Sequence, residues 1–431
     1  MNVSVIGACG HVGLPFSLVI ASAGHKVYGI DIVHQKIDLF NAGKISFIEK
    51  NADALLKDLR AQNKIEFTND PSVLHNSDVI AIMIGTPVDS ENNPRLDDIL
   101  NFVEMDLIPT ILYKKQNKMK VPLIILRSTV SPGTTDVIRD FILKSGVNNN
   151  DFILVYSPER VAQGNGIEES KRFPQLIGCE SEEDFNAAKS FFESFIDNKC
   201  IKLKTKEAEI GKLITNMYRY VNFALANEFY MIAQKIDVDI HKVIESCNLD
   251  YPRMHLPLPG PNVGGPCLYK DGKFLLTDIP FAELINVSFN INEGMPDYIY
   301  SIIKEKTQKQ KNIRVLILGG AFKAENDDTR NSLSFKLKKV LKKNGCDGYI
   351  YDPYIYRSTG KDKYTEKNDV FNSIESQYLK DFDVVVVMTP HNIFKDFISY
   401  NKDHLANNTL IIDIWKKMNE SVNTVSGVYF I

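Results

Sequence analysis

The sequence predicts an α/β protein in which two doubly wound, mostly parallel sheets flank a helical centre. Three observations support this fold class. Short apolar runs alternate with helix-length segments through the first half, a long helical pattern fills the middle, and a second group of apolar runs follows near the C-terminus. A chain of 431 residues is long enough for two or three domains, each with a core of its own.

Short, β-rich apolar runs predict the strands of the first half. A parallel sheet buried on both faces produces continuous runs of this kind, and the stretches between them are long enough for crossover helices. The predicted strands are Val3–Gly7, Lys26–Ile30, Val79–Ile84, Leu123–Leu126 and Phe152–Tyr156.

The middle of the chain has a helical pattern from about Glu207 to Ile244, without proline. Apolar residues recur there at steps of three and four, which predicts one long helix that carries domains or a dimer contact. A loop rich in proline and glycine follows, from Pro252 to Pro266. Further apolar runs predict a second sheet, with strands at Ile313–Leu318, Tyr349–Tyr351, Val384–Met388 and Thr409–Ile412. We therefore expect three domains, at residues 1–200, 201–305 and 306–431.

Composition and charge narrow the classes of function. The protein is 44% hydrophobic and 24% charged, as is usual for a soluble globular chain. Its net charge of −3 argues against a general nucleic-acid or membrane-surface binder, since such proteins carry a basic excess. The sequence shows neither a signal peptide nor an apolar run long enough to span a membrane. The six cysteines are scattered without Cys-x-x-Cys pairs, which predicts no metal site and a reducing, cytoplasmic location.

A glycine-rich turn follows the first predicted strand and opens a helical run. Gly10, His11, Val12 and Gly13 form its second half, where small residues let the backbone approach a pyrophosphate at the helix N-terminus. Asp31 ends the second strand, and a carboxylate there accepts hydrogen bonds from ribose hydroxyls, which favours NAD over NADP. The turn therefore predicts a Rossmann-like NAD site.

The spacing of this turn departs from the usual Gly-x-Gly-x-x-Gly. Ala8 stands where the first glycine is expected, and Gly7 lies one place too early, as if one residue were inserted. A glycine-rich turn that binds nothing is the alternative.

We expect Cys267 to lie in a loop rich in proline and glycine rather than in an apolar core strand, which suits a covalent nucleophile. A Gly-Gly-Pro run that begins at Gly264 precedes it, and small residues there leave room for a ligand to approach the backbone. Lys270 and Asp271 follow closely and supply charge near the thiol. The ordinary alternative is a small, buried, hydrophobic cysteine.

Polar residues on two other elements complete the candidate site. Lys212 and Asn216 lie four residues apart on the long helix, so they share a face, and a half-buried pair of this kind suits holding a water or an oxyanion. A solvated surface is the alternative. Thr129 and Glu159 each follow a predicted strand, where open parallel sheets place their ligands, although capping or turn residues also occur there.

Together these motifs resemble the UDP-sugar 6-dehydrogenase family, which includes UDP-glucose, GDP-mannose and UDP-N-acetylhexosamine dehydrogenases. The resemblance covers nearly the whole chain, and its motifs occur in order. They are Val12-Gly13-Leu14-Pro15, Gly85-Thr86-Pro87-Val88-Asp89, Ser128-Thr129-Val130, Pro158-Glu159-Arg160-Val161, Lys212 to Asn216, Gly264-Gly265-Pro266-Cys267 with Lys270-Asp271, Asn292 to Pro296, and Ala321-Phe322-Lys323 with Asp327-Asp328-Thr329-Arg330.

The resemblance implies a two-step, four-electron oxidation of a sugar C6 alcohol that uses NAD twice. Cys267 would hold the aldehyde as a thiohemiacetal and then as a thioester, which is hydrolysed to a carboxylate. By similarity, Lys212 and Asp271 would handle protons and stabilise oxyanions, assisted by Asn216 and by a water that Thr129 holds.

The resemblance also assigns binding residues. Glu159 would assist aldehyde formation or hydrolysis. Beside the glycine turn, the cofactor contacts would be Asp31, Lys36, Thr86, Thr129 and Arg330. The nucleotide-sugar contacts would be Glu159, Arg160, Val161, Lys212, Asn216, Arg253, Gly264 and Lys323, with Arg253 a candidate for reaching across a dimer interface. Family members commonly dimerise through the central helix, which implies a homodimer or a higher homo-oligomer.

The residues after Pro158 bear on the identity of the sugar. The Glu-Arg160-Val161 form is similar to UDP-N-acetylmannosamine and UDP-N-acetylglucosamine dehydrogenases, whereas UDP-glucose and GDP-mannose enzymes have Glu-Phe. UDP-N-acetylmannosamine is therefore favoured, UDP-N-acetylglucosamine comes next, and UDP-glucose remains an alternative, all in polysaccharide biosynthesis. Gln163 replaces a proline that is common in this loop. Phe289 stands where an arginine is expected, and the lost cation either alters sugar contacts or is structural.

Two other functions remain open. A one-step dehydrogenase like the 6-phosphogluconate or β-hydroxyacid group shares the glycine fingerprint, the helical middle and a lysine. It lacks the segment from Cys267 to Asp271 and the second nucleotide domain. A catalytically silent module that binds NAD or a nucleotide sugar is suggested by the shifted glycines and Phe289, and the intact Cys267, Lys212 and Asp271 oppose it.

Overall fold

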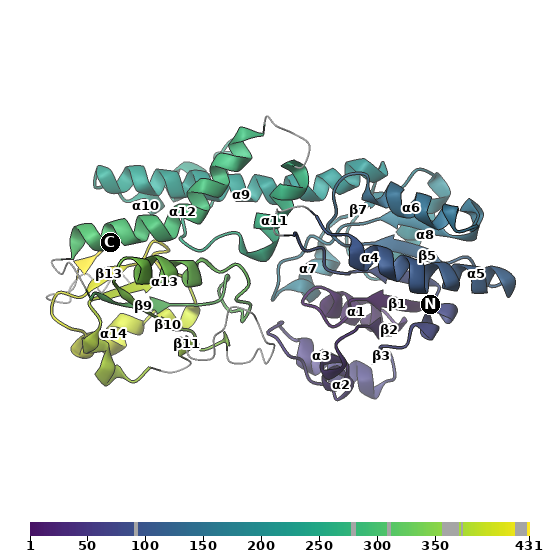
Figure 1. Cartoon of the computed structure of the whole chain (residues 1–431), viewed down its shortest axis with the longest axis horizontal. Coiled ribbons are helices and arrows are strands. Elements are labelled where there is room, and N and C mark those ends of the chain that lie inside the picture. The colour runs from purple at the N-terminus through teal and green to yellow at the C-terminus, as the bar shows by residue number, and fades with distance from the viewer. Residues whose placement is uncertain (90–93, 277–281, 308–311, 356–369, 372–373, 419–428) are drawn as a thin grey trace. The chain divides into compact units, whose positions relative to one another are not determined.

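The computed structural model describes residues 1–89, 94–276, 282–307, 312–355, 370–371, 374–418 and 429–431. Contacts divide the chain into two units. The first unit comprises Met1–Asn216 and Lys270–Ile279, and the second comprises Met217–Tyr269 and Pro280–Ile431. Each unit contains one sheet of mostly parallel strands, which confirms the predicted α/β class (Figure 1).

The first unit is built on an eight-stranded sheet in the order β3-β2-β1-β4-β5-β6-β7-β8. Every neighbouring pair is parallel except β6 and β7. The strands are β1 (Asn2–Ile6), β2 (Lys26–Ile30), β3 (Ile65–Thr68), β4 (Val79–Ile82), β5 (Leu123–Leu126), β6 (Ile153–Tyr156), β7 (Gln175–Gly178) and β8 (Cys200–Leu203). The helices are α1 (Gly13–Ser22), α2 (His34–Asn41), α3 (Ala52–Ala61), α4 (Asp97–Phe102), α5 (Ile108–Gln116), α6 (Thr134–Lys144), α7 (Gly166–Arg172) and α8 (Glu182–Phe192). The strand order reverses between β1 and β4, and the carboxyl ends at such a switch point form the usual ligand crevice of a doubly wound sheet.

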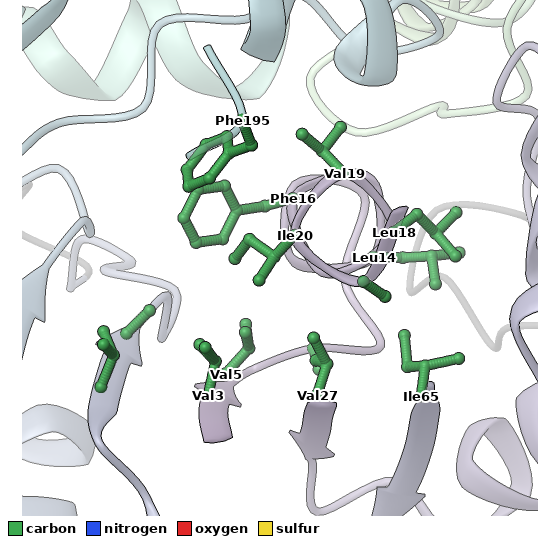
Figure 2. Packing of buried hydrophobic residues seen from close by; sticks show 14 of the residues in the cluster. Val3, Val5, Leu14, Phe16, Leu18, Val19, Ile20, Val27, Ile65 and Phe195 are labelled. Carbon is green, nitrogen blue, oxygen red and sulfur yellow. The ribbon is translucent and has the colours of Figure 1, made fainter. Parts of the chain in front are cut away.

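Helix α1 is buried on all sides and anchors the glycine turn that precedes it. Its residues from Gly13 to Ala21 are all buried. Figure 2 shows Ile20 of this helix above Val5 of β1, with Leu14 on the side nearer Ile65 of β3. A helix that is apolar all round belongs in a core, which explains why this segment lacks an amphipathic pattern.

The second unit contains a six-stranded parallel sheet in the order β11-β10-β9-β12-β13-β14. The strands are β9 (Arg314–Leu318), β10 (Asp347–Tyr351), β11 (Val370–Phe371), β12 (Val384–Val387), β13 (Leu410–Ile412) and β14 (Tyr429–Phe430). Helices α13 (Leu333–Lys343) and α14 (Phe397–Asn401) lie between strands in the sequence, and α13 lies beside β9 and β10 (Figure 1). The helices before β9 are α9 (Thr205–Lys235), α10 (Ile240–Asn248), α11 (Gly265–Leu276) and α12 (Glu283–Lys306), of which α9 and α11 contribute residues to both units.

The nine predicted strands agree with observed strands to within two residues at each end. Lys26–Ile30 and Leu123–Leu126 match fully. The sequence predictions omit β3, β7, β8, β11 and β14. These strands are short, and β3 and β8 contain exposed residues that interrupt the apolar run used as the signal.

The prediction of one helix from Glu207 to Ile244 is wrong in its second half, because α9 ends at Lys235 and α10 begins at Ile240. Asp237 adopts a φ of +56° between them. The Asp239 side chain then accepts hydrogen bonds from the first backbone N–H groups of α10. A left-handed residue followed by an N-cap ends one helix and starts the next, and periodicity alone does not reveal it.

The placement of Cys267 in a loop is also wrong. Helix α11 begins at Gly265, so Cys267 is the third residue of a helix. Pro266 is compatible with this, because the first turn of a helix does not use its backbone N–H groups.

In the described part of the chain, none of the helices has both the length and the apolar character needed to cross a membrane. Among the same residues, no three His, Cys, Asp or Glu side chains come together as a metal ion would require.

Candidate active site

The glycine turn brings the backbones of β1, β4 and α1 into close contact. Gly7 has a φ of +80°, and a Cβ on it would lie 2.7 Å from the carbonyl oxygen of Met83. A Cβ on Gly13 would lie 2.2 Å from the carbonyl oxygen of Gly7. Both positions require glycine, because a side chain on Gly7 would meet the backbone after β4 and one on Gly13 would push the helix away from the turn. The left-handed conformation of Gly7 accommodates the extra residue, so the shifted spacing still produces a tight turn.

The remaining residues of the turn are held locally. The backbone N–H of Gly10 donates to the carbonyl oxygen of Gly7 over 3.2 Å, and Val12 occupies the N-cap of α1. His11 stacks on Phe47, with ring centroids 4.2 Å apart. The turn therefore presents its backbone at the N-terminus of α1, as a pyrophosphate site requires.

Asp31 faces this turn from the end of β2. Its Oδ2 accepts a hydrogen bond from the backbone N–H of Cys9 (2.9 Å), and its Oδ1 accepts one from Val33 (3.1 Å). A carboxylate has about four lone-pair sites, so it can still accept hydrogen bonds from ribose hydroxyls. The Lys36 Nζ lies 3.5 Å from the carbonyl oxygen of Cys9. These groups fit the ribose and the pyrophosphate of a dinucleotide.

Lys270 links the carboxyl ends of β4 and β5 to a buried carboxylate. The Thr86 hydroxyl donates to the carbonyl oxygen of Thr129 over 2.6 Å. The Lys270 ammonium donates to Thr86 Oγ1 (3.3 Å) and lies 3.0 Å from Asp271 Oδ1. The sequence predicts Lys270 only as a charge near the thiol, and its contact with Thr86 was not predicted.

Asp271 is fully buried and pairs with the polar face of α9. Asn216 Nδ2 donates to Asp271 Oδ2 over 2.6 Å, although 55 residues separate the two in sequence. Lys212, one turn earlier on α9, is 9% exposed and Asn216 is 4% exposed, so this pair is more buried than the half-buried arrangement expected. A carboxylate held between an amide and an ammonium can orient a water and move a proton.

Glu159 follows β6 and has every carboxylate oxygen engaged. Its Oε2 accepts a hydrogen bond from Arg127 Nη2 (2.5 Å), and its Oε1 accepts from the backbone N–H groups of Arg160 (2.8 Å) and Val161 (3.2 Å). Burial alone would raise the pKa of Glu159, but Arg127, these hydrogen bonds and the Lys212 charge hold it below its usual value. The Arg160 guanidinium turns away and donates to the carbonyl oxygen of Pro174.

The two glycines before Cys267 combine positive φ values with close contact to aromatic rings, so neither position accepts a side chain. Gly264 has a φ of +107°, and a Cβ there would lie 2.8 Å from the Tyr220 ring. Gly265 has a φ of +54°, and a Cβ there would lie 2.4 Å from the Phe322 ring. The Cys267 side chain is exposed in the first turn of α11. A helix N-terminus favours the thiolate form of a cysteine, which is the nucleophilic form.

Asn262 connects this segment to the second sheet. Its Oδ1 accepts from the backbone N–H of Leu333 (2.8 Å), and its Nδ2 lies 3.0 Å from the carbonyl oxygen of Ala321 and 3.1 Å from Thr389 Oγ1. The side chain is 3% exposed. The sequence predictions omit Asn262. Its position five residues before Cys267 is the signal in the sequence that could have identified it.

The remaining predicted residues of the second unit are spread over its surface. Lys323 is half-buried in the segment after β9, and Arg330 is exposed. The Arg330 guanidinium pairs with Asp328, with Nη2 2.6 Å from Oδ2. Arg253 is exposed, with its guanidinium 4.8 Å from the centroid of the Tyr251 ring.

Phe289 is a core residue of the second unit. Its ring centroid lies 5.0 Å from that of Tyr220 and 5.4 Å from that of Tyr269, and the side chain is 6% exposed. The replacement of the expected arginine is therefore accompanied by an aromatic cluster, which supports the loop that carries Gly264.

The structure brings some of the predicted site residues together and leaves others apart. Within the first unit, Asn216 contacts Asp271, Thr86 contacts Thr129, and Glu159 organises the turn of Arg160 and Val161. Within the second unit, Gly264 and Gly265, which precede Cys267, pack against two aromatic rings. Cys267 belongs to the second unit and Lys212 to the first, so their approach stays a prediction.

Three domain models of one family match the chain in succession. The NAD binding domain of the UDP-glucose/GDP-mannose dehydrogenase family matches residues 1–196, its central domain matches residues 206–293, and its UDP binding domain matches residues 316–420. The first matched segment contains the glycine turn. The second contains the candidate site residues of α9 and α11, and the third contains the chain that follows β9.

Similar proteins agree with these matches. A UDP-N-acetyl-D-mannosamine dehydrogenase of Pyrococcus horikoshii is 32% identical over 92% of this chain and 90% of its own length. The solved structure of a UDP-D-ManNAc dehydrogenase from Pyrococcus horikoshii has a TM-score of 0.85 at 29% identity and covers 100% of this chain and 99% of that one. The UDP-N-acetyl-mannosamine dehydrogenase Cap5O from Staphylococcus aureus has a TM-score of 0.83 at 27% identity, with coverage of 100% and 98%. The chain belongs to the UDP-glucose/GDP-mannose dehydrogenase family and is an NAD-dependent nucleotide-sugar dehydrogenase, an oxidoreductase with a NAD site in its first unit and a UDP-sugar binding domain at its C-terminus.

Proposed function

We propose that the enzyme oxidises the C6 hydroxyl of a UDP-N-acetylhexosamine to the carboxylate in two steps, with UDP-N-acetylmannosamine as the favoured substrate and UDP-N-acetylglucosamine next. One observation carries the mechanism. Cys267 lies in the first turn of helix α11, and Asp271, one turn later on that helix, is held by Lys270 and Asn216. A nucleophile and a proton-handling carboxylate on one helix suit covalent oxidation of an aldehyde. Relatives named UDP-N-acetyl-D-mannosamine dehydrogenases support the choice of sugar.

The chemistry assigns a task to each buried polar group. NAD, bound at the glycine turn, supplies the hydride acceptor for both oxidations. Asp271 takes the alcohol proton as the aldehyde forms, and the Lys212 ammonium stabilises the oxyanion when the Cys267 thiolate adds to the aldehyde carbon. Loss of the second hydride from this thiohemiacetal leaves a thioester, and water displaces the thiolate to give the carboxylate. Asn216 and a water held by Thr129 assist, and two NAD and one water are consumed for each alcohol.

The proposed binding groups follow the three matched domains. Asp31, Lys36, Thr86, Thr129 and Arg330 would hold the cofactor, as would the turn from Gly10 to Gly13. Glu159, Arg160, Val161, Gly264, Arg253 and Lys323 would hold the nucleotide sugar together with Lys212 and Asn216. The three matched segments support the division into domains at 1–200, 201–305 and 306–431.

We expect two NADH for each sugar oxidised, with turnover of UDP-N-acetylmannosamine at least about tenfold faster than that of UDP-glucose, because a site that binds an acetamido group discriminates against a substrate lacking it. NADH absorbance, together with quantification of the uronate, gives the ratio. UDP-N-acetylglucosamine, UDP-glucose and GDP-mannose are the comparison substrates. A ratio of one would rule out the four-electron mechanism, and reaction with UDP-glucose alone would make the enzyme a UDP-glucose 6-dehydrogenase.

We further propose that the enzyme forms a homodimer through α9. Exposed apolar side chains recur on one face of this helix at steps of seven, four, three and four, which is the spacing of a buried stripe. They are Tyr218, Leu225, Phe229 and Ile232 on the helix and Ile236 directly after its end, of which Ile236 is 66% exposed.

Ile232→Glu should convert the dimer to a monomer, because it would place a charge inside the helix contact. Light scattering coupled to size exclusion measures the mass. Ile393→Glu is a matched control, because Ile232 and Ile393 are both 53% exposed and Ile393 follows β12 rather than lying on α9. An unchanged mass for Ile232→Glu would contradict this interface.

A further inference from the structure

Arg127 is a buried cation held between two aromatic rings. It directly follows β5, and its side chain is 1% exposed. The guanidinium carbon lies 4.2 Å from the ring centroid of Phe16 on α1 and 5.3 Å from that of Phe192 on α8. Rings on both elements keep the guanidinium plane in place, and this contact suits arginine better than lysine.

A single carboxylate balances this charge. Glu159 Oε2 lies 2.5 Å from Arg127 Nη2, whereas the Ser157 hydroxyl and the Gln175 side-chain oxygen lie at 3.4 and 3.5 Å from Nη1. Among the described residues, Glu159 is the carboxylate that forms an ion pair with Arg127. Removal of one partner of a buried pair leaves the other charge uncompensated, which is strongly destabilising.

Glu159 in turn holds the chain segment that follows it. Its Oε1 accepts hydrogen bonds from the backbone N–H groups of Arg160 and Val161, and its own backbone N–H donates to the carbonyl oxygen of Arg127 (3.4 Å). Among the described residues, the hydrogen bonds to this carboxylate all come from N–H donors, which is the arrangement that an ionised carboxylate requires. These contacts favour an ionised Glu159 that holds the backbone of Arg160 and Val161 and does not transfer protons.

We propose that Arg127 is a positioning residue for nucleotide-sugar oxidation, which acts by keeping Glu159 ionised so that the carboxylate holds the Arg160–Val161 turn in its binding conformation. The inference rests on the proposed function, because that function assigns the turn to the nucleotide sugar. Arg127 packs against rings of α1 and α8 and forms an ion pair with Glu159. In this proposal it acts on the sugar through the Glu159 carboxylate and not by direct contact.

Other charges near Glu159 decide what happens without Arg127. Lys212 on α9 and the backbone of Arg160 lower the pKa of Glu159, and burial raises it. The pKa of Tyr156, at the end of β6, is raised by burial and by the carboxylates of Glu209 and Asp271, and Arg127 lowers it. Without Arg127, burial is opposed only by the Lys212 charge and the backbone hydrogen bond from Arg160, so the pKa of Glu159 moves upward.

The test compares Arg127→Met with the double variant Arg127→Met, Glu159→Gln. For Arg127→Met, we expect kcat/KM for the nucleotide sugar to fall about 10- to 100-fold at pH 6 and to recover in part by pH 9, because the turn is lost as Glu159 takes up a proton. The KM for NAD should stay within about threefold. The double variant should lose this pH dependence, because it has no carboxyl to titrate.

A readout without substrate separates this proposal from the proposed function. A raised folded-state pKa makes the ionised carboxyl destabilising above its unfolded pKa of about 4.3, so the deficit in Tm of Arg127→Met should grow from pH 5 to pH 8. The deficit of the double variant should not grow. If the parent enzyme oxidised no nucleotide sugar, the proposed function would fail while this measurement still tested the hold of Arg127 on Glu159.

Two further variants guard against a merely structural effect. Arg314→Met is the first control. The Arg314 guanidinium carbon also lies 5.3 Å from two ring centroids and pairs with an aspartate, but this arginine is half-exposed and belongs to the second unit. Its replacement should leave the pH profile of kcat/KM unchanged. Arg127→Lys keeps the charge, so it should fold and keep the parent pH profile while KM for the sugar rises several-fold. A parental profile for Arg127→Met, persistence of the new pH dependence in the double variant, or an unchanged KM in Arg127→Lys would overturn the proposal.

Discussion

Cys267→Ser should lower uronate formation by at least about 10³-fold, because a serine hydroxyl adds to the aldehyde without becoming the thioester that the second oxidation needs. The affinity for NAD should be unchanged, since Asp31 and the glycine turn lie in the first unit and Cys267 lies in the second. Product analysis measures the acid, and calorimetry measures NAD binding.

Cys247→Ser is the matched control for this substitution. Like Cys267, Cys247 is an exposed cysteine of the second unit, but it lies on α10 rather than near the start of α11. Cys247→Ser should keep the parental rate of uronate formation. A thiol-alkylating reagent should inactivate both the parent enzyme and Cys247→Ser. Uronate formation at the parental rate in Cys267→Ser would remove this residue from catalysis.

Asp271→Asn should lower kcat by about 10²- to 10⁴-fold, because it removes the carboxylate proposed to move protons while keeping its shape. The variant also leaves the Lys270 ammonium without the oxygen charge that lies 3.0 Å away, which should lower the free energy of unfolding by about 1 to 2 kcal/mol. Steady-state kinetics and urea unfolding measure the two effects separately.

Asp151→Asn is the control for the loss of an ion pair. Asp151 lies 2.6 Å from Lys115 and is partly exposed, outside the site described above. Its replacement should cost less than about 1 kcal/mol and leave kcat unchanged, as is usual for pairs near the surface. A similar small effect of Asp271→Asn on kcat would show that Asp271 supports the structure without taking part in the chemistry.

Local patterns were enough to predict much of the fold. A continuous apolar run located β5 at its observed ends, because all four of its residues are buried and a strand covered on both faces favours apolar side chains. Such runs did not locate β3 and β8, whose partly exposed residues break the run. The helix break at Asp237 was equally invisible, because it depends on one left-handed residue and on the cap that Asp239 supplies.

The sequence by itself determined the α/β class, the glycine turn with Asp31, and the family to which Cys267 and its neighbours belong, because these depend on residues that are close in the chain. Only the tertiary structure decided that Asn216 pairs with Asp271 and that Lys270 reaches Thr86, which is 184 residues away. It also placed Cys267 in a helix rather than a loop. The physical reason is that a hydrogen bond or ion pair depends on where whole strands and helices pack, and short-range patterns of hydrophobicity carry no record of that packing.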